Sequence, residues 1–178
     1  MIPIGYNAKI IERPEEWLDN SKVKEILSVS ECISKSPNDH TSLWLANKWL
    51  LYNSPKTLYQ ALAETENVPS ELRQFFYETY EQTIYEDCWE AIEDPPENVI
   101  PPDEKYALRG YDIVCFTSKA APECSPLSCN SGAKEFPVNH FCLIDTHGDA
   151  LKIAEAIDRD GGYEPGPYGI MSVWEQIS

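Results

Sequence analysis

Apolar and polar residues alternate with a helical period through the middle of the chain. Five apolar side chains recur there at every fourth position: Leu72, Phe76, Tyr80, Ile84 and Cys88. On an α-helix this spacing places all five on one face, so the pattern predicts a long helix over residues 69–92. The Asp-Pro-Pro string at 94–96 should end it, because the residue before a proline avoids the helical region.

Shorter patterns predict further helices upstream, over residues 14–18, 21–33, 41–52 and 54–63. The last of these has the strongest start signal, since Ser54 is a good N-cap and the proline after it suits the first helical position. The segment 41–52 is apolar on most sides, which is typical of a buried central helix. We therefore expect residues 1–94 to be mainly helical.

The pattern changes in the last third of the chain. A proline-rich connector over 95–105 precedes predicted strands at 111–117, 141–144 and 168–174. Between the last two strands, Thr146 and Asp149 resemble a capping box, which predicts a helix ending at Gly161. The fold class predicted is α+β: helical N-terminal two thirds packed with a small C-terminal sheet (strand–strand–helix–strand, residues 106–178). We expect a single compact unit, 1–178, and see no internal repeat.

Charge is concentrated in one part of the sequence. The 178 residues include 14 basic and 30 acidic side chains, a net charge of −16. Residues 64–104 hold thirteen acids and one base, which is 1 − 13 = −12 of that total. Such a balance disfavours direct binding of nucleic acid, and the chain has no apolar run long enough to span a membrane. The chain starts without the basic and apolar stretches of a secretory signal, so we expect a cytoplasmic protein whose six cysteines are thiols.

The acidic window predicts a binding surface on the 69–92 helix. Seven residues gather on one side of that helix, away from the apolar stripe: Glu71, Phe75, Glu78, Tyr85, Glu86, Trp89 and Glu93. Aromatic side chains supply contact area and carboxylates steer a basic partner, so this face is the predicted partner-binding site. The alternative is that the aromatics pack on another helix while the carboxylates keep the protein soluble.

The loop at 122–130 is the best candidate for chemistry. Cys124 and Cys129 could be thiolate ligands of zinc, with Cys115, His140 or Cys142 completing the set, although four intervening residues are at the edge of the usual spacing. One of the two could instead be a nucleophile, which needs a base such as His140 or His147 and an orienting carboxylate such as Asp145. A purely structural turn is the third interpretation. Phosphate-binding and dinucleotide-binding motifs are absent from the sequence, and we expect no cofactor.

Several strings in the sequence occur together in a family of uncharacterised bacterial proteins that this chain resembles. They are Ile2–Tyr6, Ser28–Ser34, Gly110–Asp112, Glu123–Asn130 and Glu164–Tyr168, and Cys-Ser-Pro-Leu-Ser-Cys-Asn is the most specific part. The resemblance implies a bacterial origin and one intact unit, but no activity. Small acidic bacterial proteins also resemble, in general character, the immunity proteins that inhibit toxins.

Three functions are therefore predicted from the sequence. The first is an immunity-type inhibitor, a binding protein and not an enzyme, that docks its acidic, aromatic helix face on a basic partner such as a toxin. The second is a thiol- or zinc-dependent enzyme or metal-binding module that uses the Cys124–Cys129 loop. The third is a small-ligand receptor with a pocket between the helical part and the sheet.

Overall fold

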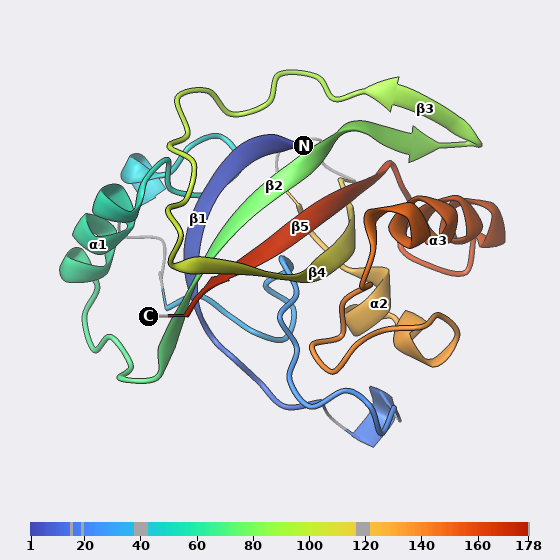
Figure 1. The fold of residues 1–178 in the computed structure, drawn as a ribbon, viewed down its shortest axis with the longest axis horizontal. Helices are drawn as coiled ribbons and strands as arrows, with labels where there is room; N and C mark the ends of the chain where they lie inside the picture. Colours follow the sequence, from blue (N-terminus) through green and yellow to red (C-terminus); the bar gives the residue numbers. More distant parts are fainter. Residues whose placement is uncertain (15, 19, 38–42, 117–121, 178) are drawn as a thin grey trace.

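The protein is built on one antiparallel sheet. The computed structural model describes residues 1–178 except 15, 19, 38–42, 117–121 and 178 (Figure 1). The strands are β1 (Ile2–Ile10), β2 (Leu72–Tyr85), β3 (Cys88–Ala91), β4 (Tyr106–Cys115) and β5 (Tyr168–Gln176). Their order is β1-β2-β5-β4, and β3 extends the sheet by pairing with the end of β2.

Helices are few and short. They are α1 (Pro55–Glu64), α2 (Pro126–Cys129) and α3 (His147–Asp160), together with single 3₁₀ turns at Glu16–Leu18, Leu43–Leu45 and Gly132–Lys134. Helices α1 and α3 lie at opposite ends of the sheet (Figure 1). Both begin where the sequence predicts, because Ser54 and Thr146 accept hydrogen bonds from the backbone N–H three residues on. Helix α3 ends at Gly161 in the left-handed conformation, as predicted.

The predicted helix over 69–92 is wrong, since these residues form β2 and β3. A spacing of four residues also keeps side chains on one face of a strand, where the period is two. The residues in between decide the matter: Phe75 and Tyr77 are fully buried on the other face of β2. Loop residues such as Leu27 cover one face of β2 and helix α1 covers the other, and the aromatic and β-branched residues of β2 favour that environment.

The other helices predicted upstream of residue 54 are also wrong. Segment 14–18 contains one 3₁₀ turn, 21–33 contains no helix, and the described part of 41–52 has a 3₁₀ turn followed by turns. Val23, Ile26 and Leu27 are buried as their pattern predicts, but they belong to a long loop that covers the sheet. The N-terminal two thirds of the chain is therefore not helical. Downstream, strands β4 and β5 confirm two predictions, whereas 141–144 supplies only an isolated bridge at Ile144.

The sheet consists of two copies of one β–loop–α–β unit, which corrects the expectation of no internal repeat. The first copy contains β1, α1 and β2, and the second contains β4, α3 and β5. Their central strands pair antiparallel with Tyr77 opposite Val173. These two residues are themselves equivalent, since they pair with Gly5 and Gly110 of the edge strands. A pseudo-twofold axis therefore passes between β2 and β5.

An asparagine-centred turn before each helix repeats the same hydrogen bonds. Asn47 and Asn139 each bond four groups through the side-chain amide. The partners of Asn47 are Ile4 O, Asn53 Oδ1, Trp49 N and Leu51 N. The partners of Asn139 are Arg109 O, Asp145 Oδ1, Phe141 N and Leu143 N. The turn fixes the loop before each helix to the edge strand of its own unit.

Glycine is required at the same place in both units. Gly5 and Gly110 have φ values of +138° and +144°, and each lies at a register shift of its edge strand. A Cβ at Gly5 would lie 2.7 Å from the Leu51 Cβ, and one at Gly110 would lie 2.7 Å from the Ile144 carbonyl oxygen. The irregularity bends each edge strand and lets the asparagine turn approach its backbone.

Candidate metal centre

Three cysteines from two distant segments meet beside the sheet. The Sγ atoms of Cys32, Cys124 and Cys129 all lie within 4.8 Å of one another, and Cys32 Sγ is 3.9 Å from Cys124 Sγ. Four-coordinate zinc with Zn–S bonds of about 2.3 Å separates its sulfur ligands by about 3.8 Å. Cys32 is exposed and the other two are half-buried, so the cluster opens to solvent at Cys32. The spacing suits three ligands of one ion.

A buried lysine holds the segment that ends at Cys32. Lys9 on β1 is fully buried, which lowers the pKa of its ammonium group, while Glu31 at 3.4 Å raises it. The Lys9 Nζ donates three hydrogen bonds to consecutive carbonyl oxygens, those of Ser28 (2.9 Å), Val29 (2.7 Å) and Ser30 (2.8 Å). Three bonds from one cation fix the path of this loop just before the cysteine.

A buried carboxyl group joins the two cysteine-bearing segments. Asp112 on β4 accepts hydrogen bonds from Ser28 Oγ (2.8 Å) and Val29 N (2.9 Å) through Oδ2. Its Oδ1 accepts one from Ser125 Oγ (2.6 Å), next to Cys124. Burial raises the pKa of Asp112 to about 6, although these hydrogen bonds lower it. Asp112 and Lys9 together make a polar frame beneath the cluster.

The thiols are not equivalent in charge. Interaction with the neighbouring Cys124 thiol and with Ser30 Oγ, 3.4 Å away, lowers the pKa of Cys129 to about 5, against the effect of burial. Interaction with the Cys115 and Cys129 side chains, together with burial, raises the pKa of Cys124. Burial likewise raises the pKa of Cys32. Of the three thiols, Cys129 is therefore the one whose environment favours the thiolate.

The predicted zinc ligands are only partly brought together. Cys124 and Cys129 meet as expected, but His140 is outside this group, with its ring centroid 3.7 Å from that of Phe141 and tilted against it. Cys115 and Cys142 are buried in the core and are not part of the three-sulfur group. Sequence reasoning did not include Cys32 among the ligands, although its serine-rich string, Ser28–Ser34, was one of the segments carrying the family resemblance.

The predicted cysteine–histidine pair does not form among the described residues. The His147 ring packs between Tyr80 and Tyr111, with centroids 5.0 and 5.6 Å away. Asp145 accepts a hydrogen bond from Asn139 in the asparagine turn. His40 lies outside the described residues. No described histidine is therefore placed to act as a base for Cys124 or Cys129.

The predicted partner-binding residues do not share a face, because the helix that was to carry them is a strand and a hairpin. Phe75 is in the core, and Glu78 accepts hydrogen bonds from Ser172 Oγ (3.0 Å) and Trp174 Nε1 (3.1 Å). Trp89 is half-buried, with its ring packed edge-on against Tyr80. The remaining four are exposed just before β2, at its end, in the β2–β3 turn or after β3: Glu71, Tyr85, Glu86 and Glu93.

Comparisons with known proteins identify no relative. No protein-family model, no curated protein and no solved structure matches this chain. Among the described residues, no helix has both the length and the apolar character needed to cross a membrane. Function is therefore inferred from the arrangement of side chains in the structure.

Proposed function

We propose that this protein binds a zinc ion through the thiolates of Cys32, Cys124 and Cys129. The observation that carries the proposal is the convergence of their three sulfur atoms within 4.8 Å from segments about ninety positions apart. Thiolates are soft ligands, which favour zinc over magnesium or calcium. The sulfur separations suit the ligands of a tetrahedral zinc ion. A cysteine nucleophile is less well supported, because no described histidine is placed to act as its base.

The polar frame supports the same proposal. Metal sites depend on outer groups that orient the ligands, and changes to such groups typically weaken metal binding. Lys9 and Asp112 serve this purpose here by fixing both cysteine-bearing loops against the sheet. The buried Lys9 ammonium also offsets part of the negative charge that three thiolates bring together.

Three protein ligands leave one coordination position for water or a small ligand. Sites with three protein ligands and an open position are typical of zinc that takes part in chemistry, whereas structural zinc has four protein ligands. The exposed side of the cluster, at Cys32, is where that position faces solvent. We therefore propose an exchangeable zinc site.

Cobalt substitution tests the proposal with a matched control. Titration of the reduced, metal-free protein with Co²⁺ should give an intense sulfur-to-cobalt charge-transfer band that saturates at one ion per chain. The band should be lost or strongly reduced in Cys32→Ser, Cys124→Ser and Cys129→Ser. Cys88→Ser should keep it, because Cys88 is exposed on β3 and outside the group.

Two results would contradict the proposal. One is a wild-type titration without a thiolate band. The other is a Cys124→Ser variant that folds normally and binds cobalt with an unchanged spectrum. A disulfide between two of the three cysteines in the fully oxidised protein is compatible with the sulfur distances, so thiols are counted before each titration.

A further inference from the structure

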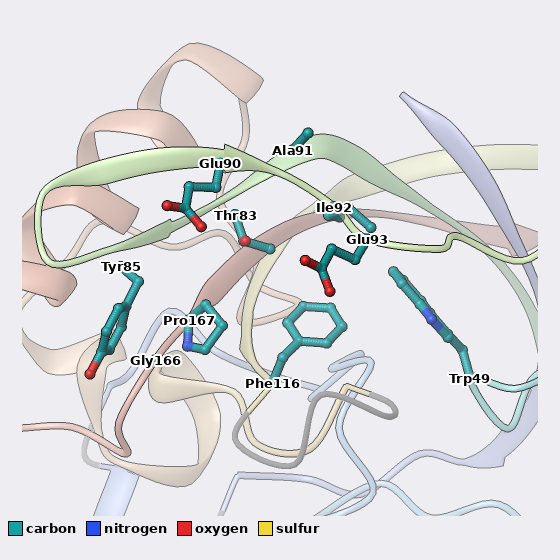
Figure 2. Close-up of a pocket in the computed structure, with 10 residues that line it drawn as sticks. All are labelled: Trp49, Thr83, Tyr85, Glu90, Ala91, Ile92, Glu93, Phe116, Gly166 and Pro167. Carbon is teal, nitrogen blue, oxygen red and sulfur yellow. The ribbon is translucent and has the colours of Figure 1, made fainter.

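A second site lies under the β2–β3 hairpin. None of the three cysteines of the metal centre lines it. It is a cavity of about 400 Å³ within the size range of small-ligand pockets. Figure 2 shows ten residues that line it: Trp49, Thr83, Tyr85, Glu90, Ala91, Ile92, Glu93, Phe116, Gly166 and Pro167. Besides the carboxylates of Glu90 and Glu93 and the hydroxyl groups of Thr83 and Tyr85, the lining side chains are aromatic or aliphatic.

The carboxylates of Glu90 and Glu93 lie on the same side of the cavity. In Figure 2 both groups point from the hairpin toward the Phe116 ring and Pro167, while Tyr85 and Trp49 stand on either side. Neither carboxylate has a hydrogen bond or ion pair with any residue that the structure describes. The described lining contains no lysine, arginine or histidine. Among the described residues, two carboxylates without an ion pair thus face an aromatic recess.

The repeat provides an internal comparison. The position of Trp49, two residues after its turn asparagine, is occupied in the second unit by Phe141, which lines a different pocket. That pocket is lined by Arg13, Lys24, Glu25, His140 and Phe141. Equivalent aromatic positions of the two units therefore line pockets of different charge, with residues of both units contributing to each pocket. The hairpin of β2 and β3, which has no counterpart beside β5, supplies Glu90 and Glu93.

We propose that the hairpin cavity binds an alkylammonium group. Aromatic faces attract such cations through their quadrupoles, and carboxylates add direct charge attraction. A bare metal ion fits less well, because two carboxylates against aromatic walls provide too few oxygen ligands. The group could belong to a free small molecule or to the end of a lysine side chain. The proposal is independent of the zinc site.

Calorimetry with a charged ligand and its neutral isostere tests the charge requirement. Choline and 3,3-dimethylbutan-1-ol have nearly the same shape, but only choline is a cation. Choline should bind roughly tenfold or more tightly than the alcohol, since the carboxylates recognise charge. A glycine-flanked lysine peptide is titrated beside them, and the tighter of the two cations identifies whether the source is free or protein-borne.

Charge-neutralising variants locate the binding. The double variant Glu90→Gln/Glu93→Gln should lose choline binding by about tenfold or more, whereas Glu64→Gln/Glu66→Gln removes the same net charge from exposed positions elsewhere and should leave it unchanged. Cys32→Ser should also bind choline normally, so failure of the zinc proposal would not affect this result. Absence of binding by both cations, equal binding of the alcohol, or full binding by the Glu90/Glu93 double variant would overturn the proposal.

Discussion

Replacing Lys9 by methionine should both destabilise the protein and weaken its metal site. The substitution keeps the approximate length of the side chain but removes the ammonium group. Three backbone carbonyls, within 2.7 to 2.9 Å of that group, then lose their donor inside the protein. Hydrogen bonds with a charged partner are worth about 1.5–3 kcal/mol each, or about 4.5–9 kcal/mol for three.

The net effect is smaller than this sum. Removing the ammonium also removes the cost of keeping a charge out of water, which is several kcal/mol for a fully buried group. Loss of one partner from a buried ionic arrangement typically costs about 3–5 kcal/mol. We expect Lys9→Met to lower the free energy of unfolding by about that amount.

Urea unfolding of the metal-free protein measures the stability change, and competition with a chelator measures zinc affinity. The urea midpoint should fall with little change in slope, and zinc affinity should fall about tenfold or more, because the loop before Cys32 is no longer fixed. Lys152→Met is the control, since Lys152 is exposed on α3 and bonds only Asp149 among the described residues (3.1 Å). A stability loss below about 1 kcal/mol would refute the energetic argument. A large stability loss with unchanged zinc affinity would refute the positioning role of Lys9.

Three further predictions test other parts of the account. Burial raises the pKa of Asp112 from 3.8 to about 6, so the native state binds an extra proton between these pH values. The stability advantage of the metal-free wild type over Asp112→Asn should therefore shrink by about 3 kcal/mol as pH rises from about 4 to 7. A stability difference that stays constant in urea unfolding would contradict this. Because the pKa values of Cys32 and Cys124 are raised, zinc binding at about pH 7 should release at least about two protons, measured by calorimetry in buffers of different ionisation enthalpy, and release of none would be inconsistent with thiolate ligation. Gly110→Ala should lower the free energy of unfolding by about 1–3 kcal/mol because of its positive φ and the 2.7 Å contact, whereas Gly148→Ala, whose Cβ would meet nothing within 4 Å, should be nearly neutral or stabilising.

Local signals in the sequence predict the ends of the elements better than their type. The caps at Ser54 and Thr146 predict the starts of α1 and α3 because a capping bond involves residues three positions apart. The segment that forms β2 was assigned to a helix because a four-residue spacing satisfies both periods. Burial on both faces of that strand depends on the loop that covers one face and on α1 over the other, which the segment itself does not encode.

The candidate site was predictable only in part for a related reason. Cys124 and Cys129 are close in sequence, so their pairing could be proposed, but Cys32 is brought to them by the fold. The frame that brings it there consists of two buried charged residues, Lys9 on β1 and Asp112 on β4. A charged residue at a buried strand position is a signal for such a frame, because it is retained only where partners satisfy it. The repeat was missed because its shared residues are a glycine and an asparagine turn, separated by loops of different length.

X-ray absorption at the zinc edge measures directly whether Cys32, Cys124 and Cys129 ligate one zinc ion. The protein purified under reducing conditions and loaded with one equivalent of zinc should show three sulfur neighbours at about 2.3 Å and one lighter neighbour. Loss of one sulfur neighbour in Cys32→Ser would confirm that the distant loop supplies a ligand. A spectrum with nitrogen and oxygen neighbours alone, or one that Cys32→Ser leaves unchanged, would contradict the account.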